Sequence, residues 1–107
     1  MTEQARNTLG RWELEVLISL PVEPDGCSLA ELAEDLIGKR GPRERGQVKH
    51  AIARLGEVLG SLPHRRGWDG LGRPAILYGL TRQQLATAAE LWDQRTRRRI
   101  PVVEGQT

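Results

Sequence analysis

Apolar residues recur at three- and four-residue spacing in four segments of the chain, and this spacing places them on one face of a helix. The first segment covers residues 8–20, and its apolar face consists of Leu9, Trp12, Val16 and Leu20, widened by Leu17. Pro21 and Pro24 end this predicted helix, because proline lacks the backbone N–H that a helix interior needs. Asp25 and Gly26 follow as a predicted turn.

The second segment has a well-marked beginning and end. Ser28 and Glu31 stand at the spacing of a capping box, in which the serine hydroxyl accepts the Glu31 N–H and the carboxylate accepts the Ser28 N–H. Gly38 closes the helix, since glycine readily takes the left-handed conformation of a C-cap. The apolar face between them consists of Leu29, Leu32, Ala33 and Leu36.

A basic connector, KRGPRERG at residues 39–46, leads into the third predicted helix. This helix begins either at Pro42, where proline fits the first helical position, or at Arg45, and it ends at Leu59. Its predicted buried face consists of Val48, Ile52, Leu55 and Leu59. At 3.6 residues per turn, the opposite face carries His50, Arg54 and Glu57.

A hairpin and a last helix complete the pattern. Residues 62–66 and 75–80 are predicted to be two strands, with Asp69 and Gly70 in the turn between them. The last helix runs from Arg82 to about Arg99 and opens with a second capping box, formed by Thr81 and Gln84. Its apolar face consists of Leu85, Ala88, Ala89, Trp92 and, at the edge, Leu91.

Composition limits the class of protein. At 107 residues, of which 38% are hydrophobic, the chain is predicted to be one domain with loose tails at residues 1–7 and 101–107. No apolar run approaches the ~20 residues of a membrane span, and the N-terminus shows no secretory signal. The single cysteine, Cys27, excludes an internal disulfide and a multi-cysteine zinc site. We therefore expect a cytoplasmic protein with no membrane association, no metal and no cofactor.

The charges are divided unevenly along the chain. Residues 1–38 contain eight acidic and two basic side chains, whereas residues 39–73 contain nine basic and three acidic ones. Fourteen of the basic residues are arginine and two are lysine, and arginine suits two-pronged contacts to phosphate and guanine. This distribution indicates either one face that binds a polyanion or an ordinary solvated surface.

Three sequence signals in this order resemble a known family. SLAELAEDLIG, at residues 28–38, followed by RGQVKHAIARL, at residues 45–55, resembles a helix-turn-helix unit. GRPAILYGLT, at residues 72–81, resembles the end of the wing in winged helix-turn-helix transcriptional regulators of the MarR, ArsR and PadR type. The resemblance covers residues 8–98, although the connector KRGPRERG is longer than the family's usual turn. It implies an α+β winged helix-turn-helix fold, with a three-helix core, a β-hairpin wing and a C-terminal helix.

The resemblance implies a transcriptional regulator that binds double-stranded DNA in a sequence-specific manner. The third helix would enter the major groove, where glutamine can read adenine and arginine or lysine can read guanine. The wing would lie on the phosphate backbone or in the minor groove, and Arg73 occupies the arginine of the family's Gly-Arg-Pro. The candidate DNA contacts are Arg43, Arg45, Gln47, Lys49, His50, Arg54, Arg65, Arg66 and Arg73.

Three residue roles have two interpretations each. Symmetric dimers let such modules read paired half-sites, so we expect a homodimer, with Leu91 and Trp92 either at its interface or over the monomer's own core. Trp68 either packs across the hairpin or contacts sugar or a partner subunit. Cys27 either packs half-buried or has a lowered pKa near a helix start, which would suit redox sensing.

The same residues bear on three other function classes: an enzyme, a protein-interaction module and an RNA-binding protein. The sequence contains no catalytic constellation and no Walker-type phosphate loop, so we expect no enzyme. The alternative to a DNA-binding regulator is a winged-helix protein-interaction module, such as a phage or plasmid accessory factor, and a third reading is an RNA-binding winged helix. The basic third helix favours nucleic acid, whereas a large exposed apolar patch on it would favour a protein partner.

Overall fold

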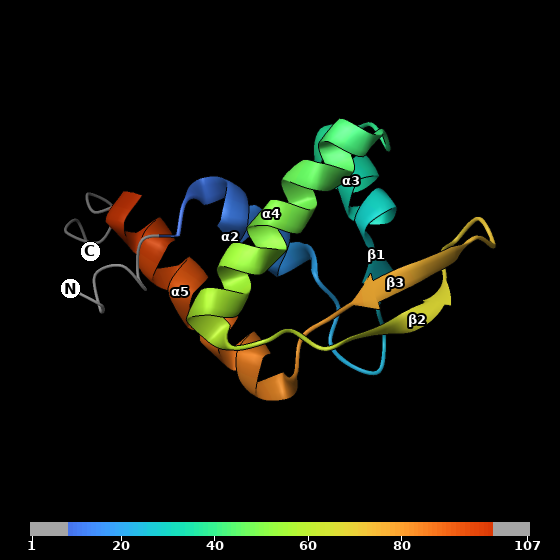
Figure 1. The fold of residues 1–107 in the computed structure, drawn as a ribbon. Coiled ribbons are helices and arrows are strands. Elements are labelled where there is room, and N and C mark those ends of the chain that lie inside the picture. Colours follow the sequence, from blue (N-terminus) through green and yellow to red (C-terminus); the bar gives the residue numbers. More distant parts are fainter. Residues whose placement is uncertain (1–8, 100–107) are drawn as a thin grey trace.

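The computed structural model describes residues 9–99, with side chains through residue 93, and confirms an α+β class (Figure 1). Four helices and a three-stranded antiparallel sheet make up this part of the chain. In order, the elements are α2 (Arg11–Ser19), β1 (Cys27–Ser28), α3 (Leu29–Ile37), α4 (Pro42–Leu59), β2 (His64–Trp68), β3 (Pro74–Tyr78) and α5 (Arg82–Arg99). The tails predicted at residues 1–7 and 101–107 lie outside the described residues.

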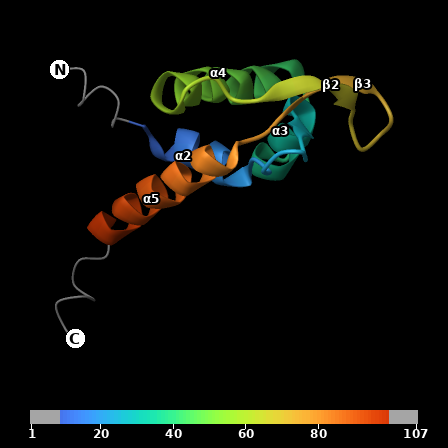
Figure 2. The same cartoon turned by 90° about the horizontal axis from the view of Figure 1, so that it is seen from below.

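The helices pack in two layers around one core. Helix α4 lies across α2 and α3 and contacts both, while α5 packs against α2 (Figure 2). The hairpin of β2 and β3 projects from the end of the molecule where α3 lies (Figure 1). The core consists of Leu9, Leu14, Val16, Leu17, Leu20, Leu32, Ala33, Val48, Ala51, Ile52, Leu55, Leu62, Leu80 and Ala88. Within the described residues, no helix is long and apolar enough to cross a membrane.

The small sheet ties the hairpin to the start of α3. The strand order is β1-β3-β2, and both pairings are antiparallel. In β3, Tyr78 pairs with Cys27 on one side and with His64 on the other. Beyond the sheet, Val22 and Leu80 form an isolated parallel bridge. The hairpin is therefore attached to the helical part of the chain through β1 and through the Val22–Leu80 bridge.

The predicted helix ends are confirmed where local chemistry determines them. Ser28 Oγ accepts the Glu31 N–H at 3.1 Å, and the Glu31 carboxylate accepts the Ser28 N–H at 3.0 Å. Gly38 caps α3 in the left-handed region at φ 92°. Of the two predicted starts of α4, the structure has Pro42 at the first turn, after Gly41 as the N-cap.

The predicted strand bounds and turn differ from those observed. Strand β2 covers residues 64–68 rather than 62–66, because Pro63 has no N–H for the ladder and pairing continues as far as Trp68 and Pro74. Strand β3 ends at Tyr78, after which the chain turns toward Val22. The residue with positive φ in the turn is Gly72, at 79°, and not Gly70.

The predicted apolar faces of the first and last helices are wrong in part. Helix α2 begins at Arg11 rather than residue 8. Leu14, which was not predicted in the apolar face, is buried together with Leu17, whereas Trp12 is only half-buried. Helix α5 packs mainly on α2, so it buries only a narrow line of side chains. Leu85 and Ala89, which were predicted in its apolar face, are exposed, and of the α5 side chains described, through residue 93, Gln84 and Ala88 are buried.

Candidate nucleic-acid interface

Helix α4 is held by its apolar face and leaves its other face to solvent. Val48, Ala51 and Leu55 are fully buried, in the layer between α4 and its neighbours α2 and α3. The indole N–H of Trp12, on α2, donates to the Gln47 carbonyl oxygen at 3.3 Å. This bond fixes α4 against α2 and leaves the Gln47 side chain exposed.

Five predicted contacts on α4 are exposed, and they lie on two sides of its outer face. Arg45 and Lys49 line a groove between α4 and the hairpin. The side of α4 toward α2 carries Arg43, Gln47 and His50, which line a shallow depression there. A ligand that covers the outer face of α4 would therefore meet both sets.

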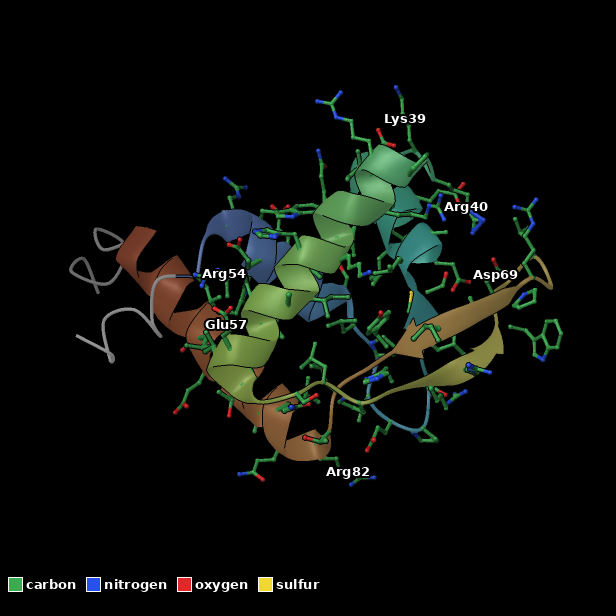
Figure 3. The ribbon with its side chains drawn as sticks, in the orientation of Figure 1. Lys39, Arg40, Arg54, Glu57, Asp69 and Arg82 are labelled. Atoms are coloured by element: carbon green, nitrogen blue, oxygen red, sulfur yellow. The ribbon has the colours of Figure 1, made fainter. Side chains whose placement is uncertain are left out.

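Arg54, the sixth predicted contact on α4, already has a partner inside the protein. Its guanidinium is partly buried and pairs with Glu57 one turn further along the helix, at 2.8 Å (Figure 3). This i,i+3 spacing was readable from the sequence. Arg54 is therefore less available to a ligand than the five exposed side chains.

The two neighbouring arginines of β2 lie on opposite faces of the hairpin, because side chains alternate along a strand. Arg65 donates from its guanidinium to the Pro24 carbonyl oxygen at 2.7 Å and is thus held against the loop before β1. Arg66 pairs in register with Ile76, which lines the groove with α4. Directly opposed residues share a face of the sheet, so Arg66 is on the groove side and Arg65 is not.

Cationic side chains from α4, the hairpin and the connector line the groove beside α4, together with neutral and apolar residues. Arg45 and Lys49 come from α4, and Arg73 comes from the hairpin turn. A fourth cation, Arg40, was not among the predicted contacts; its side chain extends from the connector toward Asp69 in the turn and pairs with Glu34 of α3 at 3.1 Å (Figure 3). The signal was present, because Arg40 belongs to the same KRGPRERG run as Arg45. The long connector therefore contributes charge to this groove.

The carboxylates near the groove are occupied by backbone donors. Asp69 Oδ1 accepts the Leu71 and Arg73 N–H groups, both at 2.9 Å, and the bond from Arg73 is the main cause of its lowered pKa. Glu31 accepts the Gly70 N–H at 3.0 Å, and its pKa is lowered chiefly by the Ser28 N–H. These bonds order the turn and favour the ionised form of both carboxyl groups.

Two large apolar side chains are exposed at the tip of the hairpin. Trp68 is 68% exposed and Leu71 is 62% exposed. Packing of Trp68 across the hairpin, one of its two predicted interpretations, thus covers little of the ring. The opposite residue in the register is Pro74.

The thiol of Cys27 does not have the lowered pKa that redox sensing would need. Burial, together with the nearby Glu31 and Asp35 carboxylates, raises the pKa of Cys27 to about 11. The side chain packs half-buried against the core. Among the residues that the structure describes, no group of three or more His, Cys, Asp or Glu side chains could hold a metal ion.

The last helix, α5, was the predicted dimer face, through Leu91 and Trp92. Leu91 and Trp92 are half-buried and pack against the core of their own chain. The exposed apolar side chains beside them are Ile18, at 51%, and Leu85, at 44%. Both residues line a shallow depression together with Trp92.

No protein-family model matches the chain, and none of the curated proteins matches its sequence.

Proposed function

We propose that this chain is a winged helix-turn-helix regulator that binds double-stranded DNA in a sequence-specific manner, without a catalytic step of its own. Helix α4 enters the major groove, and the hairpin of β2 and β3 lies on the neighbouring backbone or in the minor groove. One observation carries the proposal: Arg45 and Lys49 on α4 and Arg73 on the hairpin line one groove, with α4's outer face exposed beside it.

The architecture supports this proposal. The order of α2, α3, α4, hairpin and α5 is the order that the winged-helix resemblance implies. The B-DNA major groove is about 12 Å wide and admits one helix. Helix α4 meets that requirement, because its apolar face packs on α2 and α3 while its opposite face is open.

The candidate contacts divide into two roles. Gln47 and His50 are polar and exposed on α4, so they suit base edges in the major groove. Arg45, Lys49 and Arg73 line the groove and suit phosphates, which position the protein without carrying sequence information. We add Arg43 and Arg66 to the phosphate set. Arg40, Arg54 and Arg65 join only by exchanging Glu34, Glu57 or the Pro24 carbonyl for a phosphate.

We also propose that the protein binds DNA as a homodimer through the face of α2 and α5. Ile18 and Leu85 are exposed on this face beside the half-buried Leu91 and Trp92. A two-fold symmetric pair would place two α4 helices on successive half-sites. Sedimentation of the free protein measures this directly, and a monomer at every concentration would contradict it.

Selection of bound sequences from random duplex DNA tests the function. We expect an enriched motif, and a palindrome for the dimer. A set of bound duplexes with no shared motif would leave only non-specific binding. No duplex binding at any salt concentration would overturn the proposal.

The alternative is a winged-helix protein-interaction module, and the exposed Trp68 and Leu71 at the hairpin tip favour it. Such a module would bind its partner with little dependence on salt. Phosphate contacts instead weaken steeply as salt rises. Titrations at two salt concentrations therefore separate the two classes.

A further inference from the structure

Trp68 and Leu71, at the hairpin tip, have the highest exposed fractions among the exposed large hydrophobic side chains of the described residues. Trp68 is 68% and Leu71 is 62% exposed, above the 51% of Ile18 and the 44% of Leu85. Apolar surface in water has a free-energy cost that is roughly proportional to its area. Two large side chains, three residues apart on one turn, therefore mark a contact site.

Trp68 lies on the same hairpin face as the groove beside α4. It pairs in register with Pro74, just as Arg66 pairs with Ile76, and both of these partner residues line the groove. Side chains two residues apart on a strand share a face. A surface that covers α4 and the groove will therefore also reach Trp68.

The turn that carries these side chains is held in place before any ligand arrives. The Asp69 N–H donates to the Arg73 carbonyl at 2.9 Å, and Asp69 Oδ1 accepts two further backbone N–H groups. Glu31 binds the Gly70 N–H from outside the hairpin. Because the loop is already ordered, a contact made there costs little conformational entropy.

The surroundings of the tip favour a polyanion over an apolar protein surface. Arg66 precedes Trp68 by two residues on the same face, and Arg73 lies next to Pro74. Both arginines are exposed, so they interrupt any broad apolar patch. A DNA minor groove matches this mixture, because its phosphate rims are anionic and its deoxyribose walls are apolar. Its narrow regions attract arginine, and it accepts apolar side chains.

We propose that Trp68 and Leu71 pack against the deoxyribose walls of the minor groove next to the major groove that α4 occupies, while Arg66 and Arg73 hold its phosphates. This inference rests on the proposed DNA-binding function and deepens it. Trp68 thereby contributes affinity through apolar contact and not through charge.

The test uses the duplex enriched by selection and three variants of the full chain. Trp68→Ala should weaken binding roughly ten-fold, the order of loss seen when an aromatic contact to a nucleotide is removed. Leu71→Ala should weaken it less. Ser61→Ala, an exposed side chain in the loop after α4 that lines neither the groove nor the proposed dimer face, is the control and should change binding by less than about two-fold. Thermal melts should show all three variants folded, since these side chains are exposed.

Two further readouts identify the kind of contact. The slope of log affinity against log salt should stay unchanged in Trp68→Ala but fall by about 0.9 in Arg66→Ala, because only the arginine releases counterions. Hydroxyl-radical footprinting of Trp68→Ala should lose protection of deoxyriboses at the edge of the footprint and keep it at the centre.

The outcomes separate this inference from the function on which it rests. If the wild-type chain binds the selected duplex and Trp68→Ala binds equally well with the same footprint, the inference is wrong and the DNA-binding proposal stands. If the wild-type chain enriches no duplex, the function itself is overturned. If Trp68→Ala abolished binding to a protein partner and left duplex binding unchanged, the hairpin tip would instead belong to the protein-interaction module.

Discussion

Glu31 and Gly70 are 39 residues apart in sequence, and the Glu31 carboxylate joins them by accepting the Gly70 N–H at 3.0 Å. The other oxygen of the same carboxylate accepts the Ser28 N–H and completes the cap of α3. One side chain thus orders both the start of a core helix and the turn of the hairpin. A Cβ at position 70 would lie 3.0 Å from Glu31 Oε2, so glycine leaves room for this approach.

Glu31→Ala should loosen both elements at once. We expect the free energy of unfolding to fall by about 1 kcal/mol through loss of the cap, and amide hydrogen exchange at Gly70 to become faster. Asp35→Ala is the matched control, because it removes an exposed carboxylate from the same helix. Equal exchange rates at Gly70 in the two variants would contradict the role of Glu31.

The order of the turn should depend on pH in the acid range. The pKa of Glu31 is lowered from its ordinary value of 4.5 and that of Asp69 from 3.8, in both cases mainly by backbone N–H donors. A carboxyl pKa lowered by folding stabilises the fold above the unfolded value, and the gain is lost as the pH falls through the folded value. Amide chemical shifts of Gly70 and Arg73 should therefore change only below these ordinary values. A midpoint at or above 4.5 for Gly70 would contradict the bond.

Gln84 makes a second long-range connection, from α5 to the end of α4. Its side-chain amide donates toward the Leu59, Gly60 and Ser61 carbonyl oxygens at 3.2–3.4 Å, while its oxygen accepts the Thr81 N–H. Gln84→Glu keeps the acceptor but turns a carboxylate oxygen toward these carbonyls.

We expect Gln84→Glu to lower the free energy of unfolding by about 1–3 kcal/mol, because the carbonyls lose their donor in a buried site. Gln83→Glu is the control, since Gln83 is exposed in the same first turn and a glutamate there is favourable to the helix dipole. Denaturant melts of both variants measure the difference. Similar values for the two would show that the amide bonds contribute little.

The features that the sequence predicts well are those that depend only on residues close to each other along the chain. Ser28 with Glu31 and Thr81 with Gln84 are each three residues apart, so both capping boxes are visible in the spacing. The bonds of Glu31 to Gly70 and of Gln84 to α4 are not, because they join segments that only the fold brings together. Arg65 differs from Arg66 for the same reason: its partner, the Pro24 carbonyl, lies 41 residues away.

The candidate site shows the same division. The exposed face of α4 follows from helical periodicity, and its five exposed contacts were found in this way. The groove needs two elements and a connector in their observed positions, so Arg40 was missed although its charge was noticed. The apolar face of α5 was predicted too wide, because helical periodicity shows which face is apolar but not how many of its side chains are covered by neighbouring elements. Ala88 is buried, whereas Leu85 lies in solvent.

The same substitution at two isoleucines measures how far the core depends on α4. Ile52 is 8% exposed between α4 and its neighbours, whereas Ile18 is 51% exposed on α2. Ile52→Ala should lower the free energy of unfolding by about 2–5 kcal/mol, through lost burial and the cavity left behind. At concentrations where the protein is monomeric, Ile18→Ala should change it by no more than about 0.5 kcal/mol, because only the proposed dimer covers this side chain. Parallel thermal and denaturant melts measure both variants, and a comparable loss at Ile18 in the monomer would mean that Ile18 packs in the core.

The cations that line the groove should contact DNA phosphates directly. If Lys49 and Arg73 each neutralise a phosphate, Lys49→Ala and Arg73→Ala should each reduce the slope of log affinity against log salt by about 0.9. Both should weaken strong and weak duplex sites alike, because a phosphate carries no sequence information. Arg82→Ala is the matched control, since Arg82 is exposed at the start of α5, away from the groove (Figure 3).

Arg82→Ala removes the same charge but should leave the slope of log affinity against log salt unchanged. If the slope fell equally in Lys49→Ala, Arg73→Ala and Arg82→Ala, the effect would come from net charge and not from a defined groove.

His50→Ala should instead change sequence preference, because the His50 side chain lies on the outer face of α4 and suits a base edge. We expect it to cost about 1–3 kcal/mol on the best site with little change on poor ones. A variant at His50 that weakens every duplex equally would instead place the phosphates over the middle of α4, and the reading face would then be sought toward Arg43 and Gln47.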